Sequence, residues 1–253
     1  MSFNIRYDNP WDGVNIWSNR KELVFDLLRN SDCDFICLQE AVMNQYIDLE
    51  NAIFEYKALG RSREQDPRSG EACPIFYKHN AWEWLDNETF WLSHTPNLPA
   101  TTYGEMIPRV VTWAKFRNKS TYKEIHIINT HFPYESIKLQ LKAAQHVITY
   151  INEKCQNQPV ILCGDFNATE QSEVIRLFLS NSMLDLYRAV NKNNKGLGTF
   201  HDWTGSQKGD RIDFIFSKNN IIPLNSLIVH YSQNNKFPSD HFPVVAEIET
   251  YEQ

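Results

Sequence analysis

Short apolar runs alternate with polar segments along the whole chain. Nine of these runs are rich in Val, Ile, Phe and Tyr, which suit the pleated surface of a packed strand. None approaches the roughly 20 apolar residues that a membrane-spanning helix needs. We predict strands at 3–7, 35–39, 74–78, 110–116, 124–130, 160–163, 212–216, 227–231 and 244–248.

Three segments show helical spacing instead. In 19–29 four apolar side chains share one face, and Ser18 is a candidate N-cap. The segment 136–154 repeats apolar residues every three to four positions, and 170–179 does the same after Thr169, another candidate cap. Few helices among many strands predict an α/β fold in which two sheets pack together with helices outside.

The sequence shows no sign of a boundary between domains. It carries no internal repeat, low-complexity segment or long Pro/Gly/Ser linker, so we expect a single domain over 1–253. The stretches 66–70 and 192–198 are predicted to be exposed loops. The first residues do not resemble a signal peptide, and the compartment stays open between the cytoplasm and export after loss of a signal peptide.

Composition and charge narrow the class of protein. Hydrophobic residues make up 42% and charged residues 22% of the chain, as in soluble globular proteins. The net charge of −6 and the dispersed basic residues disfavour a protein that grips long nucleic acids. The five cysteines are odd in number and match no zinc spacing, so we interpret them as reduced thiols without a role.

Several predicted strands end in, or carry, polar residues that a core does not need. Each has an ordinary explanation as a cap, a turn or a surface residue. Six such groups together favour one shared site, because burying them is costly unless a metal ion or hydrogen bonds compensate. The groups are Asn4, Gln39-Glu40, Asn129-Thr130-His131, Asp165-Phe166-Asn167, Arg211-Ile212-Asp213 and Ser239-Asp240-His241.

The residue types at these positions suit the hydrolysis of a phosphate ester. A carboxylate such as Glu40 is the hard oxygen ligand that Mg²⁺ prefers, and Mg²⁺ needs few protein ligands. His131 and Asn167 can donate hydrogen bonds to phosphate oxygens. Asp213 can orient His241, since a carboxylate fixes the tautomer of an imidazole.

The stretch that follows the predicted strand 160–163 is the centre of this hypothesis. Gly164 is expected to let the chain turn sharply where the strand stops. Asp165 and Asn167, with Phe166 anchored between them, would then face one phosphate. Asp165 could hold or deprotonate the attacking water.

This ordered set of motifs resembles the endonuclease/exonuclease/phosphatase superfamily, and it spans positions 4 to 241 in the family's order. That superfamily includes deoxyribonucleases, abasic-site endonucleases, neutral sphingomyelinases, inositol polyphosphate 5-phosphatases and poly(A) deadenylases. The resemblance implies a four-layer α/β/β/α sandwich of two packed mixed sheets with outer helices. It also implies one active site at an edge of the packed sheets.

The resemblance further implies a metal site. Glu40 would be the main ligand of Mg²⁺, with Mn²⁺ as an alternative ion. Asn4 and Asp240 would lie close to the metal. Whether one or two ions bind is left open.

It also implies the catalytic residues. His131 and Asn167 would contact the scissile phosphate, and Asp165 would position or activate the water. Asp213 would pair with His241. Members of the superfamily differ over the proton acceptor, so Asp165 and the His241–Asp213 pair are both candidates.

The substrate is less constrained than the reaction. Segments 3–9 and 108–114 resemble a bacterial branch whose members mostly carry only the superfamily name, and Arg109 could either clamp a phosphate oxygen or form a surface ion pair. That branch usually places an acid and a second histidine after Asn-Thr-His-Phe. Here the residues are Pro133-Tyr134-Glu135-Ser136, so the branch does not fix the substrate.

Three functions are compatible with the sequence. The first is a Mg²⁺-dependent phosphoesterase that acts on a small or lipid-like phosphate mono- or diester. The second is a DNA or RNA nuclease that uses the same site, ranked lower because no long DNA-gripping insertion is present. The third is a catalytically silent binding module, which the intact motif set disfavours. The oligomeric state is left open.

Overall fold

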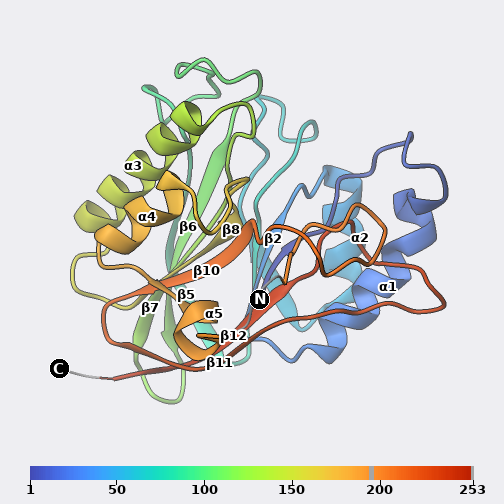
Figure 1. Ribbon diagram of the computed structural model, residues 1–253. Coiled ribbons are helices and arrows are strands. Elements are labelled where there is room, and N and C mark those ends of the chain that lie inside the picture. The colour runs from blue at the N-terminus through green and yellow to red at the C-terminus, as the bar shows by residue number, and fades with distance from the viewer. Residues whose placement is uncertain (194–196, 252–253) are drawn as a thin grey trace.

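Two packed sheets with helices on both outer faces make up the protein, as the computed structural model shows for residues 1–193 and 197–251 (Figure 1). Both sheets are mixed and six-stranded within these described residues. The predicted four-layer α/β/β/α sandwich is therefore confirmed.

The first sheet contains both ends of the chain. Its central strand, β1, runs parallel to one neighbour and antiparallel to the other. Its strands, from edge to edge, are β11 (Ile221–Ile228), β12 (Val244–Thr250), β1 (Ser2–Asn4), β2 (Phe35–Gln39), β4 (Ile75–Lys78) and β3 (Tyr56–Leu59).

The second sheet is built from the middle of the chain. One parallel pair lies among antiparallel neighbours at its centre. Its strands, from edge to edge, are β5 (Trp82–Trp91), β6 (Val110–Asn118), β7 (Glu124–His131), β8 (Val160–Asp165), β10 (Asp213–Lys218) and β9 (Leu184–Asp185).

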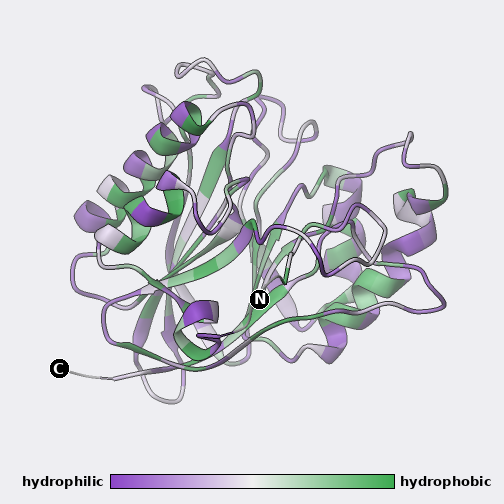
Figure 2. Cartoon of the chain, viewed as in Figure 1, coloured by the Kyte–Doolittle hydropathy of each residue, from purple (hydrophilic) through white to green (hydrophobic). Residues whose placement is uncertain are grey.

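The helices cover the two outer faces of the sandwich (Figure 1). Helices α1 (Trp17–Asn30) and α2 (Met43–Ala52) pack on the first sheet, and α3 (Ile137–Lys154) and α4 (Glu173–Ser180) pack on the second. Figure 2 shows hydrophobic residues on the inward sides of these helices. The short helices are η1 (Gly13–Asn15) and α5 (Leu186–Val190).

Three apolar layers follow from this arrangement, one between the sheets, one under α3 and α4, and one under α1 and α2. The layer between the sheets includes Ile75, Phe116 and Ile161. The layer under α3 and α4 is rich in aromatic rings, with Phe166 and Phe178 in edge contact at 5.4 Å between ring centroids. Phe166 is fully buried, so the predicted anchor between Asp165 and Asn167 is present.

Some predicted boundaries are wrong for local reasons. The first strand ends at Asn4 and not at residue 7, because the Asn4 side chain accepts a hydrogen bond from Arg6 N and Arg6 turns to a φ of 54°. Helix α1 begins at Trp17, without a Ser18 cap. The cap of α4 is Ser172 and not Thr169.

The hydrophobic pattern of the sequence did not predict several other elements. Strand β5 is an edge strand that exposes Glu83 and Asp86. These polar residues interrupt the apolar pattern by which a strand is predicted. They also protect the edge from pairing with another chain. The predicted strand 227–231 overlaps β11 only at its end, and α2 and β3 were not predicted.

The predicted loop 66–70 is mostly exposed and lies outside any strand or helix. Residues 194–196 of the predicted loop 192–198 lie outside the described residues. Within the described part, no helix is both long enough and apolar enough to cross a membrane.

Candidate active site

The polar strand ends meet at one edge of the sandwich because of strand register. Asp165 ends β8, and its register partner on the parallel strand β7 is His131. Its partner on the antiparallel strand β10 is Asp213. Three residues that are far apart in the sequence are thus neighbours across one sheet.

Gly164 contributes through close packing rather than through a turn. It lies inside β8, opposite Thr130 of β7. A Cβ atom at Gly164 would lie 2.4 Å from the Thr130 carbonyl oxygen. The predicted turn is therefore wrong, and the glycine instead allows the two strands to approach where the site begins.

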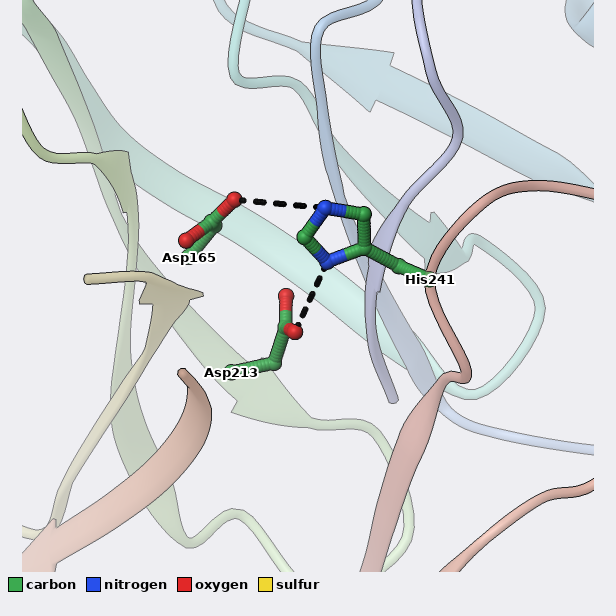
Figure 3. A group of neighbouring side chains, drawn as sticks. All are labelled: Asp165, Asp213 and His241. Atoms are coloured by element: carbon green, nitrogen blue, oxygen red, sulfur yellow. Dashed lines mark hydrogen bonds and ion pairs between the residues drawn. The ribbon is translucent and has the colours of Figure 1, made fainter. Parts of the chain in front are cut away.

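Asp213, His241 and Asp165 form a chain of charged groups (Figure 3). His241 Nδ1 and Asp213 Oδ2 are hydrogen-bonded at 2.9 Å, and His241 Nε2 lies 3.8 Å from Asp165 Oδ2. All three side chains are buried. The contact of Asp213 with His241 has the geometry that orients an imidazole.

The electrostatics of this chain favour a charged imidazole. Burial alone lowers the pKa of His241, but the carboxylates of Asp213, Asp165 and Asp240 outweigh it and raise the pKa to about 10. Burial and the Asp213 carboxylate raise the pKa of Asp165 to about 7, against the opposing effects of His241 and Asn4. The three carboxylates therefore favour the protonated form of His241.

His131 and Asn167 form a second pair beside Asp165. Asn167 Nδ2 lies 3.0 Å from His131 Nε2 and donates to Phe132 O at 3.0 Å, which identifies this atom as the amide nitrogen. Burial, and then the charges of Arg109 and His241, lower the pKa of His131 far below its usual range. The neutral ring accepts at Nε2 and thus carries its proton on Nδ1, a buried atom without a partner.

Asn4 links two carboxylates. Its Nδ2 donates to Glu40 Oε1 and to Asp165 Oδ2, both at 2.9 Å. The backbone N–H of Tyr7 donates to Glu40 Oε2 at 3.0 Å. Glu40 itself adopts a left-handed backbone conformation, with a φ of 63°, which is rare outside functional sites and turns.

Glu40 and Asp240 have the chemistry of a site for a hard cation. Burial is the main cause that raises the pKa of Asp240, and the neighbouring Glu40 carboxylate adds to it. The opposing charge of Arg6 is 3.9 Å away, between Arg6 Nε and Asp240 Oδ2. Carboxylates that repel each other next to the Asn4 amide fit Mg²⁺ or Mn²⁺, because a divalent ion would relieve this repulsion.

A different group of possible ligands consists of Asp165, Asp213 and His241, whose ligand atoms lie within 4.8 Å of one another. Two of them, Asp213 Oδ2 and His241 Nδ1, already share a hydrogen bond. A metal ion bound to both atoms would have to replace that bond. This trio is therefore less suited to a divalent ion than Glu40 and Asp240.

Arg109 lies beside His131 without a counterion. It directly precedes β6 and is only 4% exposed. Within the described residues it forms no ion pair, and its Nε has no hydrogen-bond partner. The alternative of a surface ion pair is therefore wrong. The ring of Tyr134, from the segment that departs from the bacterial branch, covers the guanidinium with 5.7 Å between the ring centroid and Cζ.

Two residues near the site carry no sequence signal. Arg63 and Glu71 lie in the loop between β3 and β4 and pair at 2.7 Å between Nη1 and Oε2. Both residues interact electrostatically with the site. Burial is the main cause that lowers the pKa of His131, and the charge of Arg63 adds to it. Burial also raises the pKa of Glu71, and the Glu40 carboxylate adds to that shift. Charged residues in a Gly- and Ser-containing loop look solvated in the sequence, so the pattern gave no reason to choose them.

Other polar residues support the site without facing it. Gln39 Nε2 donates to Asn129 Oδ1 at 2.7 Å, which ties the two sheets together under the site. The buried Arg20 donates from Nη1 to both Ile5 O and Pro238 O. It thereby joins the segment after Asn4 to the segment before Asp240.

Comparisons with known proteins agree with this geometry. An endonuclease/exonuclease/phosphatase from Bacteroides vulgatus is 32% identical, with a TM-score of 0.90, and the match covers 98% of this chain and 97% of that one. A mannosyl-6-phosphatase from Bacteroides thetaiotaomicron is 28% identical, with a TM-score of 0.90 and coverage of 98% of both chains.

More distant relatives include the 3'-5'-exoribonuclease subunit Ccr4 of the CCR4-Not complex from Kluyveromyces lactis. It is 22% identical over 92% of this chain, which spans 37% of that protein's length. Residues 1–241 match the sequence model of the Endonuclease/Exonuclease/phosphatase family. The chain therefore belongs to the endonuclease/exonuclease/phosphatase family, whose members are hydrolases of phosphate esters.

Proposed function

We propose that this protein is a divalent-metal-dependent phosphoesterase that hydrolyses a small or lipid-like phosphate ester. The observation that carries the proposal is the position of Asp165. Its Oδ2 accepts from Asn4 and lies 3.6 Å from His131 Nε2 and 3.8 Å from His241 Nε2. One carboxylate thus adjoins the metal-site residues, the phosphate-binding residues and a cationic imidazole.

Asp165 and His241 divide the work of the reaction in this proposal. Asp165 orients the attacking water and accepts its proton, and a pKa raised to about 7 suits a general base at neutral pH. His241 is already protonated, so it stabilises the negative charge that develops on the phosphate. Asp213 keeps the imidazole in place through the bond to Nδ1.

Substrate binding falls to the neighbouring residues. A bound phosphate would replace the hydrogen bond between Asn167 and His131 and accept from both side chains, with the proton of His131 moved to Nε2, and Arg109 supplies a buried charge that forms no ion pair within the described residues. Glu40 and Asp240, with Asn4 beside them, hold the divalent ion, Mg²⁺ or Mn²⁺. When bound, the ion lowers the repulsion between the phosphate and the carboxylates of the site.

A nuclease is the second candidate. It is supported by the exoribonuclease relatives, which share the family but are at most distantly similar. A small substrate is favoured by the similarity to the mannosyl-6-phosphatase over nearly the whole of both chains. It is also favoured by the net charge of −6.

A parallel assay tests the proposal. The protein is incubated with a phosphomonoester, a bis-phosphodiester and plasmid DNA, each with Mg²⁺ or with excess EDTA. We expect faster turnover of a small ester than of plasmid, and no turnover in EDTA. Full activity in the chelator would refute the metal-dependent mechanism, and faster turnover of plasmid would promote the nuclease.

A further inference from the structure

A cluster of buried and partly buried charges lies next to the candidate phosphate-binding residues. Arg63 and Glu71 lie in the loop between β3 and β4, and Arg109 directly precedes β6. Their mutual influence is visible in Glu71, where burial raises the pKa and both arginines oppose the shift. Both arginines also follow burial among the causes that lower the pKa of His131. The charges of this cluster therefore act on His131, a candidate phosphate-binding residue.

Arg63 has a partner in this cluster and Arg109 has none. Arg63 Nη1 donates to Glu71 Oε2 at 2.7 Å. Another buried carboxylate, Glu105, accepts from Tyr103 N at 2.9 Å and forms no ion pair with Arg109. Within the described residues, Arg109 thus forms no ion pair, although Glu71 is near enough to be affected by its charge.

Water has little access to this guanidinium. Arg109 is 4% exposed, and the half-exposed Tyr134 covers it. The small cavity that Arg109 lines with Tyr103, Glu105 and Pro133 has a volume of about 10 Å³, room for about one water molecule. An uncompensated buried charge costs several kcal/mol, so this position is built for an anionic ligand.

We propose that Arg109 binds the second negative charge of a phosphate monoester, so that the site is selective for monoesters over diesters. This inference rests on the proposed function. A diester phosphate carries one negative charge, which a divalent ion at Glu40 and Asp240 would already oppose. The dianionic monoester brings one more charge, and Arg109 is the buried cation that remains to pair with it.

The geometry disfavours a diester for a second reason. In a diester, one more phosphate oxygen carries a carbon substituent and is a poorer acceptor. A substituent directed toward Arg109 would have to fit beside His131 and the cavity of about 10 Å³. A monoester avoids this, and its hydrolysis releases an alcohol and inorganic phosphate, with water supplying the new phosphate oxygen and the proton of the alcohol.

Rates on two matched substrates test the inference. We would measure kcat/KM for p-nitrophenyl phosphate and bis(p-nitrophenyl) phosphate with the wild type, Arg109→Gln and the control Arg61→Gln. Arg61 is an exposed arginine that stacks over Trp91, with 5.0 Å between Cζ and the ring centroid. We expect the wild type to prefer the monoester.

Arg109→Gln should lower kcat/KM for the monoester by about 10- to 100-fold, the worth of a charge-assisted hydrogen bond, and by under about threefold for the diester. Arg61→Gln should leave both values within about twofold. Equal losses on the two substrates in Arg109→Gln, or a wild type that prefers the diester, would overturn the inference.

Binding of inorganic phosphate gives a readout that does not depend on turnover. Calorimetric titration in Mg²⁺ should show weaker binding to Arg109→Gln, with Arg109→Lys between it and the wild type, and thermal melting should show that both variants fold. Unchanged phosphate affinity in Arg109→Gln would contradict the inference. If the wild type hydrolyses neither ester, the proposed function fails, whereas the titration still decides the role of Arg109.

Discussion

At the scale of single residues, Asp165 connects the candidate metal-binding residues with the two histidines of the site. Through Asn4 it is linked to Glu40, and its carboxylate lies within 4 Å of the reactive nitrogens of His131 and His241. Loss of a residue in either part should therefore have a distinct effect. Changes at Glu40 should act on the metal, and changes at His241 should act on turnover and on pH dependence.

Glu40→Ala should raise the Mg²⁺ concentration needed for half-maximal activity by about 10-fold or more, because a carboxylate ligand is lost. High Mg²⁺ should restore part of the rate. A Mg²⁺ titration of the initial rate measures this, with the exposed Glu22→Ala as control. An unchanged Mg²⁺ requirement in Glu40→Ala would place the metal elsewhere.

His241→Gln should lower kcat by about 10²- to 10⁴-fold while the protein stays folded. It should also remove a pH effect on stability in EDTA. The folded pKa of about 10 lies above the unfolded value of 6.5, so the stabilisation by protonated His241 is complete below about pH 6.5 and is lost as the pH rises to about 10.

Urea unfolding of wild type and His241→Gln across this window checks the second effect. The difference in their free energies of unfolding should shrink by an amount on the order of 3 kcal/mol between pH 6.5 and pH 10. A difference that is constant with pH would mean that His241 is neutral in the native protein.

Most residues of the candidate site could be predicted from the sequence, because they lie where an apolar strand begins or ends. His131, Asp165 and Asp213 are examples, and sheet register brings them together. It could not be predicted that Arg109 forms no ion pair within the described residues. Whether an arginine has a counterion depends on loops whose path no periodic pattern encodes.

At the scale of elements, the approach of β7 and β8 sets the distance between His131 and Asp165. Their parallel pairing runs to the last residue of each strand. Gly164, one residue before the end, provides the space for this approach. The strand interiors were predictable from their apolar runs, whereas the polar edge strand β5 was not, because it presents only part of its surface to the core.

Gly164→Ala should destabilise the protein by about 2–4 kcal/mol, since the new methyl group would meet the Thr130 carbonyl oxygen at 2.4 Å. The residual folded enzyme should also turn over more slowly, as His131 and Asp165 are pushed apart. Gly209→Ala is the comparison and should cost less, because its Cβ would meet its nearest atom, the Phe200 carbonyl oxygen, at the larger distance of 3.1 Å. Equal melting temperatures of wild type and Gly164→Ala would show that the strands separate at no cost.

At the scale of the whole molecule, the sandwich confines the candidate chemistry to one edge and leaves the surface acidic overall, with a net charge of −6. The family resemblance predicted this architecture from motifs spread over positions 4 to 241, and two bacterial structures of the same family share it. The substrate is a different matter, since the same fold and residues serve several phosphate esters.

Activity on a small ester should depend little on salt between about 50 and about 200 mM, because few charges of the substrate are bound. An enzyme that follows a nucleic-acid backbone would lose affinity steeply over that range. Rates on p-nitrophenyl phosphate and on plasmid DNA across the salt series measure the difference. A plasmid rate above the small-ester rate, with a steep loss in salt, would contradict the preference for small substrates.

The most direct measurement of the central claim is the initial rate of Asp165→Asn on the best small ester at saturating Mg²⁺. The substitution keeps the size of the side chain and removes its charge and basicity. With folding confirmed by melting, we predict a rate about 10²- to 10⁴-fold below that of the wild type. A rate within about threefold of the wild type would contradict the assignment of Asp165 as the centre of the site.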